Sequence, residues 1–543
     1  MATTVTSTNT VTTEVVDMCD DNYYYVDATL GDDGGDGHYY EPWQTIGKVN
    51  GESFDPGDHI LLKCGETWVD QSLIVPSSGV AGQPIVFGKY GVGDNPLIDG
   101  SRTLTGWSNH ADNVYEIGSF TDTDRVQIAL FEDGVRLIKR TSLVAVVGAG
   151  EFFLDDPNNI IYAWCTDGAD PDTHTMKFTS QQDCVLVNNK QYVDFDGIDG
   201  TMAYLCGYNL RANGNGNINI RNATVSWVTQ RCFDLGGLSK VGGGGSRVTW
   251  HDYMVCTDCI AHDSIGEGFW LGMGTGCGCV SCTAYGCGTD RTSKAYTGIQ
   301  NAGSAFTVAC DCIDFYLLDC IGYNCPSGTS IASIEFVVAE GDQPLRTVID
   351  GCTFYRSGSN NDMLLMDEGL DSSITNNLFY ALSGGNYLVR LGMSSTAPST
   401  DSLYYHNTFD TDNVAAQQIF YCYYGTGMTF KNNIYSVRGG SGYAYMVTTN
   451  AQTGFVSDYN QWDSCGVSKW GASWYNLANW RTTTGQDANT IANNPVFITP
   501  GTDYHLQVTS PCIAAGDPAV GVLVDKDNVT RGAAVDMGAY EYI

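Results

Sequence analysis

One short phrase recurs along the middle of the chain: a strand-forming stretch, a small or polar corner residue, and a second strand-forming stretch. The corner residues follow one another at intervals of 23 to 38 residues. They are Asn222, Cys259, Cys282, Cys320, Cys352, Asn377, Asn407 and Asn433. An irregular repeat of this length, built from short strands, predicts a solenoid in which each coil buries its apolar side chains against the next.

The composition agrees with an all-β solenoid and excludes two classes of partner. The 543 residues include 64 glycines and 12% aromatic residues, and long amphipathic helical patterns are absent. The formal charge of −35 repels nucleic acid and anionic membrane surfaces. No apolar run reaches the length of a membrane-spanning helix. We therefore expect no nucleic-acid partner and no membrane span.

The 20 cysteines have three readings. Disulfides are typical of short secreted chains, and this chain is long. Cys256-x-x-Cys259 and Cys279-x-x-Cys282 have a spacing that zinc sites use. Four cysteines, however, stand at the corner position that asparagine occupies in other coils, so we interpret most of them as reduced, stacked side chains.

Phrases near both ends of the chain resemble a known architecture. After residues 1–20, which read as a flexible arm, come a strand at Tyr23–Asp27, a Gly/Asp loop and a short helix at Pro42–Ile46. Pro56-Gly57-Asp58-His59-Ile60 follows, and Asp536-Met537-Gly538 stands near the C-terminus. This order resembles the right-handed parallel β-helix proteins of the pectate-lyase-like group, which includes polysaccharide lyases, glycoside hydrolases and phage tailspikes.

The resemblance and the repeat together divide the chain. We expect an arm or attachment segment, an N-terminal cap with the first coils, a small β insertion, the parallel β-helix coils, and a C-terminal closing segment. Their predicted ranges are 1–20, 21–114, 115–191, 192–463 and 464–543.

Function in such a solenoid must lie on outward side chains, since inward ones form the core. Period-two alternation sends Phe269, Phe306, Met366 and Val389 inward, among others. The same alternation predicts an outward set of Trp270, Thr307, Glu335, Asp367 and Arg390.

This outward set predicts a sugar-binding or sugar-cleaving groove. Coils lie about 4.8 Å apart, so Glu335 and Asp367 in consecutive coils suit the separation of a glycosidase acid pair. Arg390 would orient a hydroxyl or carboxylate, and Trp270 would stack on a sugar ring. The alternative is a solvated ladder of charges in which Arg390 neutralises Asp367. Glu340 and Glu368, just after the strands, are alternates as groove-wall residues.

Two further sets of residues could serve catalysis or metal binding. Arg291 and Lys294, in a loop between coils, could supply the base of a lyase, or form an ordinary polar loop. The Gly-rich stretch that follows the first strand offers hard oxygen ligands for Ca²⁺, or forms a bare turn. Its carboxylates are Asp27, Asp32, Asp33 and Asp36.

The resulting hypothesis is a carbohydrate-active surface or virion protein that binds and cleaves a polysaccharide or cell-surface glycan, with a glycosidase favoured over a lyase. The alternative is a non-catalytic tail fibre, spike or filament subunit. We expect no required cofactor, with Ca²⁺ as the alternative, and assembly as a homotrimer or within a larger particle. Met1–Asp20 lacks the pattern of a secretory signal, and the expected location is extracellular or virion-associated.

Overall fold

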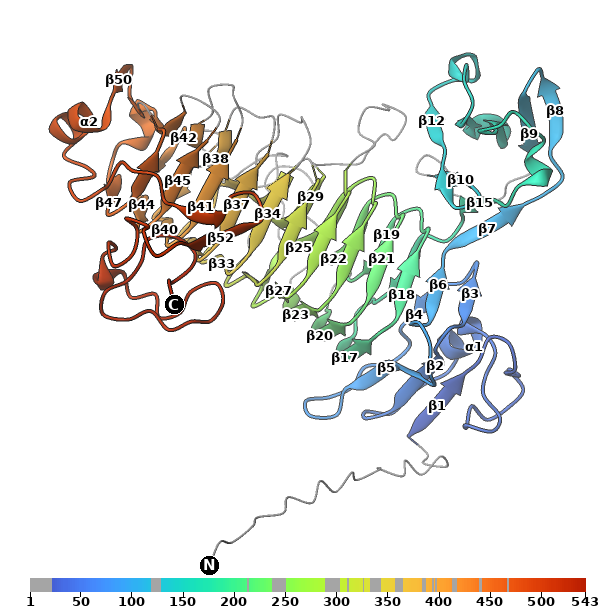
Figure 1. Ribbon diagram of the computed structural model, residues 1–543. Helices are drawn as coiled ribbons and strands as arrows, with labels where there is room; N and C mark the ends of the chain where they lie inside the picture. Colours follow the sequence, from blue (N-terminus) through green and yellow to red (C-terminus); the bar gives the residue numbers. More distant parts are fainter. Residues whose placement is uncertain are drawn as a thin grey trace, which may run out of the picture.

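Three long parallel sheets wind along one axis, and each coil supplies one strand to each sheet (Figure 1). The structure is a computed structural model, nearly all β, and this parallel β-helix confirms the predicted fold class. It describes residues 22–543 apart from these: 119–127, 212–213, 237–250, 289–302, 310–311, 326, 333–342, 357–364, 383–386, 393–394, 396–397, 413–417, 439–441 and 466–467.

The chain visits the three sheets in the order A, B, C. Sheet A comprises β1 (Tyr23–Val26), β2 (His59–Lys63), β5 (Ile85–Tyr90), β17 (Gln191–Asp196), β20 (Gly216–Arg221), β23 (His251–Thr257), β27 (Gly278–Val280), β30 (Tyr316–Leu318), β33 (Val348–Asp350), β36 (Ser373–Thr375), β40 (Leu403–Tyr405), β44 (Thr429–Lys431) and β47 (Val456–Asp458), with β26 (Gly274–Thr275) beside β23. Sheet B comprises β3 (Thr67–Val69), β6 (Leu97–Asp99), β18 (Asp199–Thr201), β21 (Thr224–Ser226), β24 (Ile260–His262), β28 (Thr283–Tyr285), β31 (Ile321–Tyr323), β34 (Thr353–Arg356), β37 (Leu378–Ala381), β41 (Thr408–Thr411), β45 (Ile434–Val437) and β48 (Gln461–Asp463).

Sheet C runs along the third side of the helix. It comprises β4 (Leu73–Ile74), β16 (Asp183–Leu186), β19 (Cys206–Asn209), β22 (Arg231–Gly236), β25 (Glu267–Gly272), β29 (Ser304–Ala309), β32 (Ser327–Ala332), β35 (Leu365–Asp367), β38 (Tyr387–Leu391), β42 (Gln418–Cys422), β46 (Tyr443–Val447), β49 (Ser468–Trp470) and β50 (Ser473–Tyr475). Between β39 (Ser399–Thr400) and β43 (Gly425–Thr426) a further parallel pair forms at a corner.

Inward side chains stack from coil to coil to form a continuous apolar core. On sheet C the rings of Phe233, Phe269 and Phe306 stack with centroid separations of 4.7 and 5.0 Å. The predicted inward positions Phe269, Phe306 and Val389 are fully buried. Stacking of identical side chains at the coil spacing gives each coil the same shape as its neighbour, which lets the parallel ladders continue.

The corner between sheets A and B contains two consecutive residues with different structural roles. The first residue adopts a left-handed backbone with φ between 52° and 68° and donates its N–H to the next coil; examples are Asn222, Asp258 and Gly351. The second residue points inward. Because Thr224 pairs with Ile260, the residue of its coil that matches Cys259 is Ala223. Asn222 is therefore a left-handed residue that matches Asp258, and the prediction that it belongs to the inward stack was wrong.

The inward corner residues form a ladder of hydrogen bonds. The Asn377 N–H donates to Asn407 Oδ1 at 2.9 Å, and the Asn407 Nδ2 donates to the Ile374 carbonyl at 2.8 Å. Asn433 repeats the pattern, and Asn460 N–H donates to Thr490 Oγ1 to end the ladder. Each asparagine thus satisfies a buried amide of one coil and a buried carbonyl of another, which water cannot reach.

Cysteines continue this ladder toward the N-terminus. Cys352 Sγ lies 3.4 Å from the Leu317 carbonyl and 3.3 Å from the Cys320 N–H, which is the bonding of asparagine at longer distances. All cysteines that the structure describes are free, as the stacking interpretation predicts. Within the described residues, the two Cys-x-x-Cys pairs do not bring three ligand atoms within 4.8 Å of one another, so the geometry does not favour the zinc alternative.

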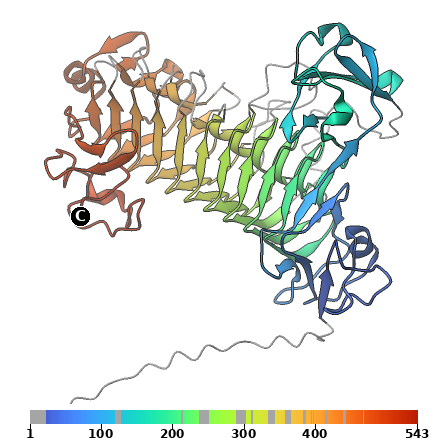
Figure 2. The same ribbon diagram turned by 45° about the vertical axis from the view of Figure 1, so that its right-hand side comes forward.

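The insertion projects from the first coils as two small sheets, one antiparallel and one mixed (Figure 2). One contains β7 (Ser101–Leu104), β10 (Leu130–Glu132), β11 (Val135–Arg136) and β15 (Met176–Thr179). The other contains β8 (Ser108–Ala111), β9 (Val114–Gly118), β12 (Ile138–Arg140), β13 (Glu151–Asp155) and β14 (Ile160–Trp164), and in it β12 and β13 pair in parallel. Its strands therefore run from Ser101 to Thr179, against the predicted range of 115–191, and β16 already belongs to sheet C.

The two ends of the solenoid are closed by helices. At the start, α1 (Ile46–Gly51) buries Ile46 and Val49, and Thr45 caps it, so the helix begins where the predicted one at Pro42–Ile46 was expected to end. At the other end, α2 (Leu477–Thr484) places Trp480 over the last core layer, where its ring lies 5.5 Å from that of Trp470. Both caps shield sheet edges that would otherwise pair with another chain.

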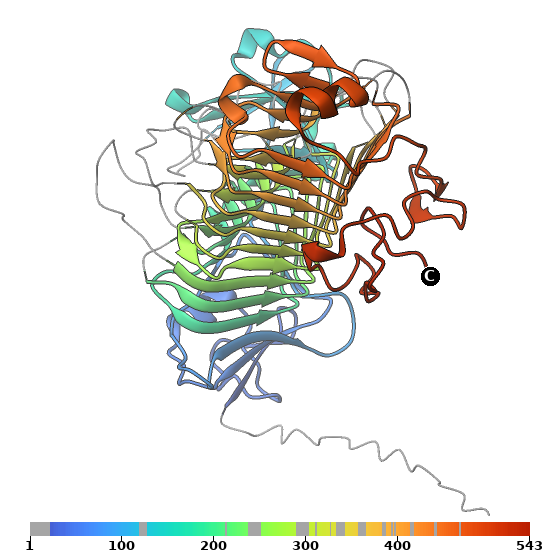
Figure 3. The same ribbon diagram turned by 90° about the vertical axis from the view of Figure 1, so that its left-hand side faces the viewer.

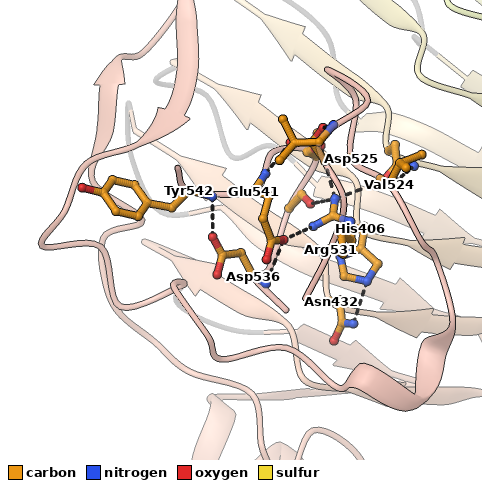
Figure 4. A network of polar contacts seen from close by, with 12 residues as sticks. His406, Asn432, Val524, Asp525, Arg531, Asp536, Glu541 and Tyr542 are labelled. Carbon is orange, nitrogen blue, oxygen red and sulfur yellow. Dashed lines mark hydrogen bonds and ion pairs between the residues drawn. The ribbon is translucent and has the colours of Figure 1, made fainter. Parts of the chain in front are cut away.

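The C-terminal segment returns along the side of the coils instead of covering their end (Figure 3). Its hairpin β51 (Phe497–Thr499) and β52 (Asp503–Leu506) packs on outward side chains of sheet B such as Ile434. Arg531, which forms an ion pair with Glu541 (Figure 4), donates to Asn376 Oδ1 at 3.0 Å. Asn432 Oδ1 accepts the Asp517 N–H at 2.7 Å. The left-handed corner residues of the last coils thus anchor this segment. No helix in the described part of the chain is long and apolar enough to cross a membrane.

The ladder generates a prediction about stability. Asn407→Ala leaves the Asn377 N–H and the Ile374 carbonyl buried without partners, so we expect a loss of about 2–4 kcal/mol in the free energy of unfolding. Asn407→Cys should lose less, because a thiol does the same bonding in neighbouring coils. Urea denaturation of both variants measures the difference, with exposed Asn450→Ala as the control. Equal losses for the alanine and cysteine variants would contradict the ladder's role.

Candidate functional site on the outer face of sheet C

The register of sheet C defines one row of outward positions along the whole solenoid. Cα pairing connects one residue per coil through this row. Among residues whose side chains the structure describes, the row contains Leu186, Asn209, Asp234, Trp270, Thr307, Arg390, Tyr421, Met446 and Lys469. It includes Trp270, Thr307 and Arg390 from the predicted outward set, but not Asp367.

A cluster of charged side chains occupies the N-terminal half of this face. Arg231, at the start of β22, donates from Nε to Glu267 Oε2 at 2.9 Å and from Nη1 to Asp234 Oδ2 at 2.7 Å. Asp234 also makes an ion pair with Arg211 at 3.0 Å. The guanidinium of Arg231 therefore lies between two carboxylates that belong to adjacent strands.

Asp183 and Asn209 extend this charged cluster toward the insertion. Asn209 Nδ2 and the Cys206 N–H both donate to Asp183 Oδ1, at 3.1 and 3.2 Å. Asp234 has no exposed surface and Glu267 is 1% exposed, so the charged cluster is enclosed. Burying this many ionisable groups is costly unless they are paired. One atom departs from that rule: Glu267 Oε1 is buried with no hydrogen-bond partner among the described residues.

Burial sets the protonation of the cluster. It raises the pKa of Glu267 to about 7 even though Arg231 opposes the shift. Burial likewise raises the pKa of Asp183 to about 7, against the hydrogen bond from Asn209. Burial acts in the opposite direction on Arg231, but Asp234 and Glu267 raise its pKa above the usual value. A carboxyl group that holds its proton near neutral pH is suited to donate it.

Trp270 is outward, as predicted, yet it is not an open platform. The guanidinium of Arg231 lies 3.8 Å from the centre of its ring, and the side chain is 3% exposed. Its indole face is therefore already occupied by a cation–π contact. Trp270 thus packs against Arg231 of the charged cluster, and its ring face is not open to a ligand.

The C-terminal half of the same face carries a half-open aromatic surface, formed by Tyr387, Arg390, Tyr421, Tyr423, Tyr443 and Trp474. Tyr421 contacts both Tyr387 and Tyr423 at a centroid separation of 5.4 Å, and Arg390 lies 5.8 Å from the Tyr423 ring. The rings of Tyr443 and Trp474 lie 4.5 Å apart, and Trp474 is 45% exposed. Arg390 Nε has no hydrogen-bond partner in the described part of the chain.

Asp367 faces the interior, so its predicted outward position is wrong. It pairs with Leu391, one residue past Arg390, and is fully buried. Tyr404 Oη donates to its Oδ2 at 2.5 Å, and the Gly369 N–H donates to its Oδ1 at 2.8 Å. Burial raises the pKa of this carboxyl group. Glu368, the alternate, is 2% exposed and therefore no open groove wall.

Outside the described residues lie four other predicted site residues: Glu335, Glu340, Arg291 and Lys294. The last sheet C strand described before Glu335, β32, ends at Ala332. The position of Glu335 on the sheet face and its role in catalysis therefore stay predictions.

The acidic loop near the N-terminus uses its carboxylates as internal acceptors. Asp27 pairs with Lys63 at 2.6 Å and accepts the Leu30 N–H. Asp33 accepts from the Thr45 N–H and hydroxyl, and Asp32 accepts the Gly34 N–H. Asp36 is exposed. Across the described residues these four do not supply three ligand atoms within 4.8 Å of one another, and the Ca²⁺ site stays a prediction.

Sequence reasoning missed the charged cluster, although part of the signal was present. Phe233-Asp234 and Phe269-Trp270 have the same inward–outward order, so aligning the phenylalanines would have placed Asp234 beside Trp270. Glu267 gave no such signal. It has the parity of the inward Phe269, but it stands at the first position of β25, where the strand leaves a corner.

Comparison with known proteins shows what this architecture is similar to. No family model matches the sequence, and no curated protein gives a significant match. A solved complex of XylC with xylose matches 96% of this chain and 98% of its own, with a TM-score of 0.65 and 12% identity. The chain has the parallel β-helix fold. Two further solved structures match with lower TM-scores. They are pectate lyase Pel9A (TM-score 0.44, 15% identity, 96% of both chains) and a rhamnogalacturonan lyase (TM-score 0.40, 13% identity, 88% of this chain and 91% of that one).

The raised pKa of Glu267 predicts a pH dependence of stability. Its protonated carboxyl stabilises the folded state fully below about pH 4, and this contribution disappears as the pH rises through about 7. Between pH 5 and 8 the wild type should lose about 2–3 kcal/mol more than Glu267→Gln, which cannot ionise. Chemical denaturation across this range tests the difference. Exposed Glu41→Gln is the control and should follow the wild type; parallel profiles for all three would refute the shift.

Proposed function

We propose that this protein binds a polysaccharide along the outer face of sheet C and cleaves it as a glycoside hydrolase. The observation that carries the proposal is the half-open aromatic surface around Arg390, whose exposed member Trp474 is 45% accessible. Sugar rings present apolar C–H faces that stack on aromatic side chains, while guanidinium groups donate hydrogen bonds to hydroxyl and carboxylate oxygens.

The geometry of the face suits an extended ligand. Its outward row advances about 4.8 Å per coil, which offers an extended sugar chain contacts at each coil. Arg390 and Tyr421 occupy adjacent positions of this row, and Lys469 lies farther along it, 5.4 Å from the Trp474 ring. A glycan lying along the row would meet aromatic and cationic side chains in turn. The local positive charge of Arg390 and Lys469 offsets, at this place, the overall charge of −35.

For cleavage we assign the acid and its partner to the charged cluster. A glycosidase needs one carboxylic acid to protonate the leaving oxygen and one carboxylate to act as base or nucleophile. Glu267, whose pKa burial raises to about 7, would be the acid, and Asp234, held by Arg211 and Arg231, would be the carboxylate. Arg231 keeps the two groups apart. Glu335 remains a second candidate for the acid or base.

The residues favour hydrolysis over elimination. A lyase removes the proton beside a sugar carboxylate, so it requires a base and a cation that neutralises the acid group. The cations of the charged cluster, Arg211 and Arg231, are both engaged with Asp234. Arg291 and Lys294 stay the candidates for a lyase base.

One observation favours a second function, that of a non-catalytic rod that binds a glycan or a partner subunit. Glu267 and Asp234 are almost completely enclosed, as is Asp367. In this alternative the charged cluster only joins four coils, and the aromatic surface alone makes contacts. A tail fibre, spike or filament subunit would fit, and the extracellular or virion-associated location and the homotrimer stay predictions in either case.

Binding is tested at the aromatic surface. We expect Trp474→Ala and Arg390→Ala each to weaken binding to the best ligand in a panel of neutral and acidic polysaccharides by roughly 3- to 10-fold, since one aromatic contact contributes about 0.5–1.5 kcal/mol. Tyr40→Ala, which removes an aromatic ring 76% exposed in the N-terminal cap, is the control. Affinity electrophoresis or calorimetry measures the effect. Unchanged binding in both variants would place the glycan elsewhere.

Cleavage is tested on the same panel by the release of reducing ends and the absorbance of unsaturated products. Glu267→Gln and Asp234→Asn should each reduce hydrolysis by 100-fold or more, by analogy with the loss of general acid–base catalysis, estimated at about 10²–10⁴. Activity of the wild type should fall as the pH rises through about 7, when Glu267 loses its proton. Glu335→Gln is tested beside them. Binding without cleavage at any pH would favour the rod, and unsaturated products would favour the lyase.

A further inference from the structure

The insertion brings three different metal-ligating side chains together from three segments of the chain. Glu132 ends β10, Cys165 follows β14, and His174 follows the 3₁₀ turn Pro171–Thr173. Their ligand atoms all lie within 4.8 Å of one another. No other His, Cys and carboxylate group in the described part of the chain meets this criterion, and the candidate glycan site contains none of the three.

We propose that Glu132, Cys165 and His174 form a zinc site that fastens the loops of the insertion. A thiolate, an imidazole and a carboxylate are the ligands that Zn²⁺ combines, whereas Ca²⁺ and Mg²⁺ select oxygen ligands alone. Three protein ligands leave a fourth tetrahedral position, which Asp133 or water would fill. Asp133 offers a further carboxylate, with its Oδ2 2.8 Å from His174 Nδ1.

Hydrogen bonds from neighbouring residues hold Glu132 and His174 in fixed orientations. Glu132 is 3% exposed and accepts hydrogen bonds from the Thr166 N–H and hydroxyl, which fix its carboxylate beside Cys165. His174 Nδ1 lies 3.6 Å from Glu132 Oε1, while its Nε2 lies 3.3 Å from Asp167 Oδ1. A carboxylate on the far nitrogen of a ligating histidine selects the tautomer that leaves the other nitrogen free to bind a metal.

Burial of the cluster makes an unoccupied thiol and carboxylate costly, which a cation would offset. Cys165 is fully buried, and the side chain of His174 is 15% exposed on the open side. An ion could therefore enter past His174 and Asp133. Since Glu132 adjoins Phe131, which packs on Trp227 of the β-helix, the ion would also stiffen the junction between insertion and coils.

The experiment uses the full-length protein, stripped with a chelator, dialysed and titrated with Zn²⁺ or with Co²⁺ as a spectroscopic substitute. We expect one Zn²⁺ per chain, a higher melting temperature, and a thiolate-to-Co²⁺ charge-transfer band in the near ultraviolet. Cys165→Ser should abolish the band, and His174→Gln should abolish tight binding. Asp167→Asn should weaken Zn²⁺ binding by about 10- to 100-fold, as a group that orients a ligand does.

Matched controls separate this site from incidental binding. Cys64→Ser removes a half-exposed thiol elsewhere, and His110→Ala removes another histidine of the insertion, which contacts Glu116. Both should bind as the wild type does. Circular dichroism of the metal-free proteins shows whether each variant folds, and His174→Gln changes the least buried ligand. An unchanged Co²⁺ band in Cys165→Ser, or equal stabilisation by Ca²⁺, would overturn the proposal.

Discussion

The hydrogen bonds at the corner between sheets A and B are the interaction on which the rest of the structure depends. From Cys259 to Asn460 a left-handed residue turns the chain at this corner, and the side chain of the next residue bonds to a neighbouring coil. Without that side chain, buried backbone groups of these coils would be left unpaired. Asparagine meets this need in the last coils, and cysteine meets it more weakly in the middle ones. The stacking of three sheets and the register of the outward rows follow from this corner.

The solenoid could be predicted because its signal is repeated many times. Short strands, corner residues and inward aromatics such as Phe269 and Phe306 recur in phase, so errors at single positions do not change the fold. One such error shows the limit of the pattern. Asn222 and Asn377 look alike in sequence, yet the first adopts the left-handed conformation and the second follows a left-handed residue. Asparagine suits both positions, for its backbone in one and its amide in the other.

The site was harder to predict because its strands are very short. In a strand of three residues, such as β35, alternation leaves two registers open, and the corner decides between them. Asp367 therefore points inward to Tyr404, while Arg390 in the next coil points outward. The charged cluster was not predicted for a different reason. Its members Asp183 and Glu267 are the first residues of their strands, where the inward–outward alternation has not yet begun. Burial, which determines their protonation, has no local sequence signal at all.

The C-terminal segment, which packs back along the coils, affects where the solenoid would begin to unfold under force. A free solenoid frays from its last coil, since each coil touches only its neighbours. Here the final residues reach back past several coils, where Lys526 donates to the Gly351 carbonyl and Arg531 to Asn376. The C-terminal segment is thus attached by polar contacts to coils in the middle of the solenoid. Tension applied at Ile543 would be taken up first by these polar contacts and by the hairpin packed on sheet B, before the last coil could peel away.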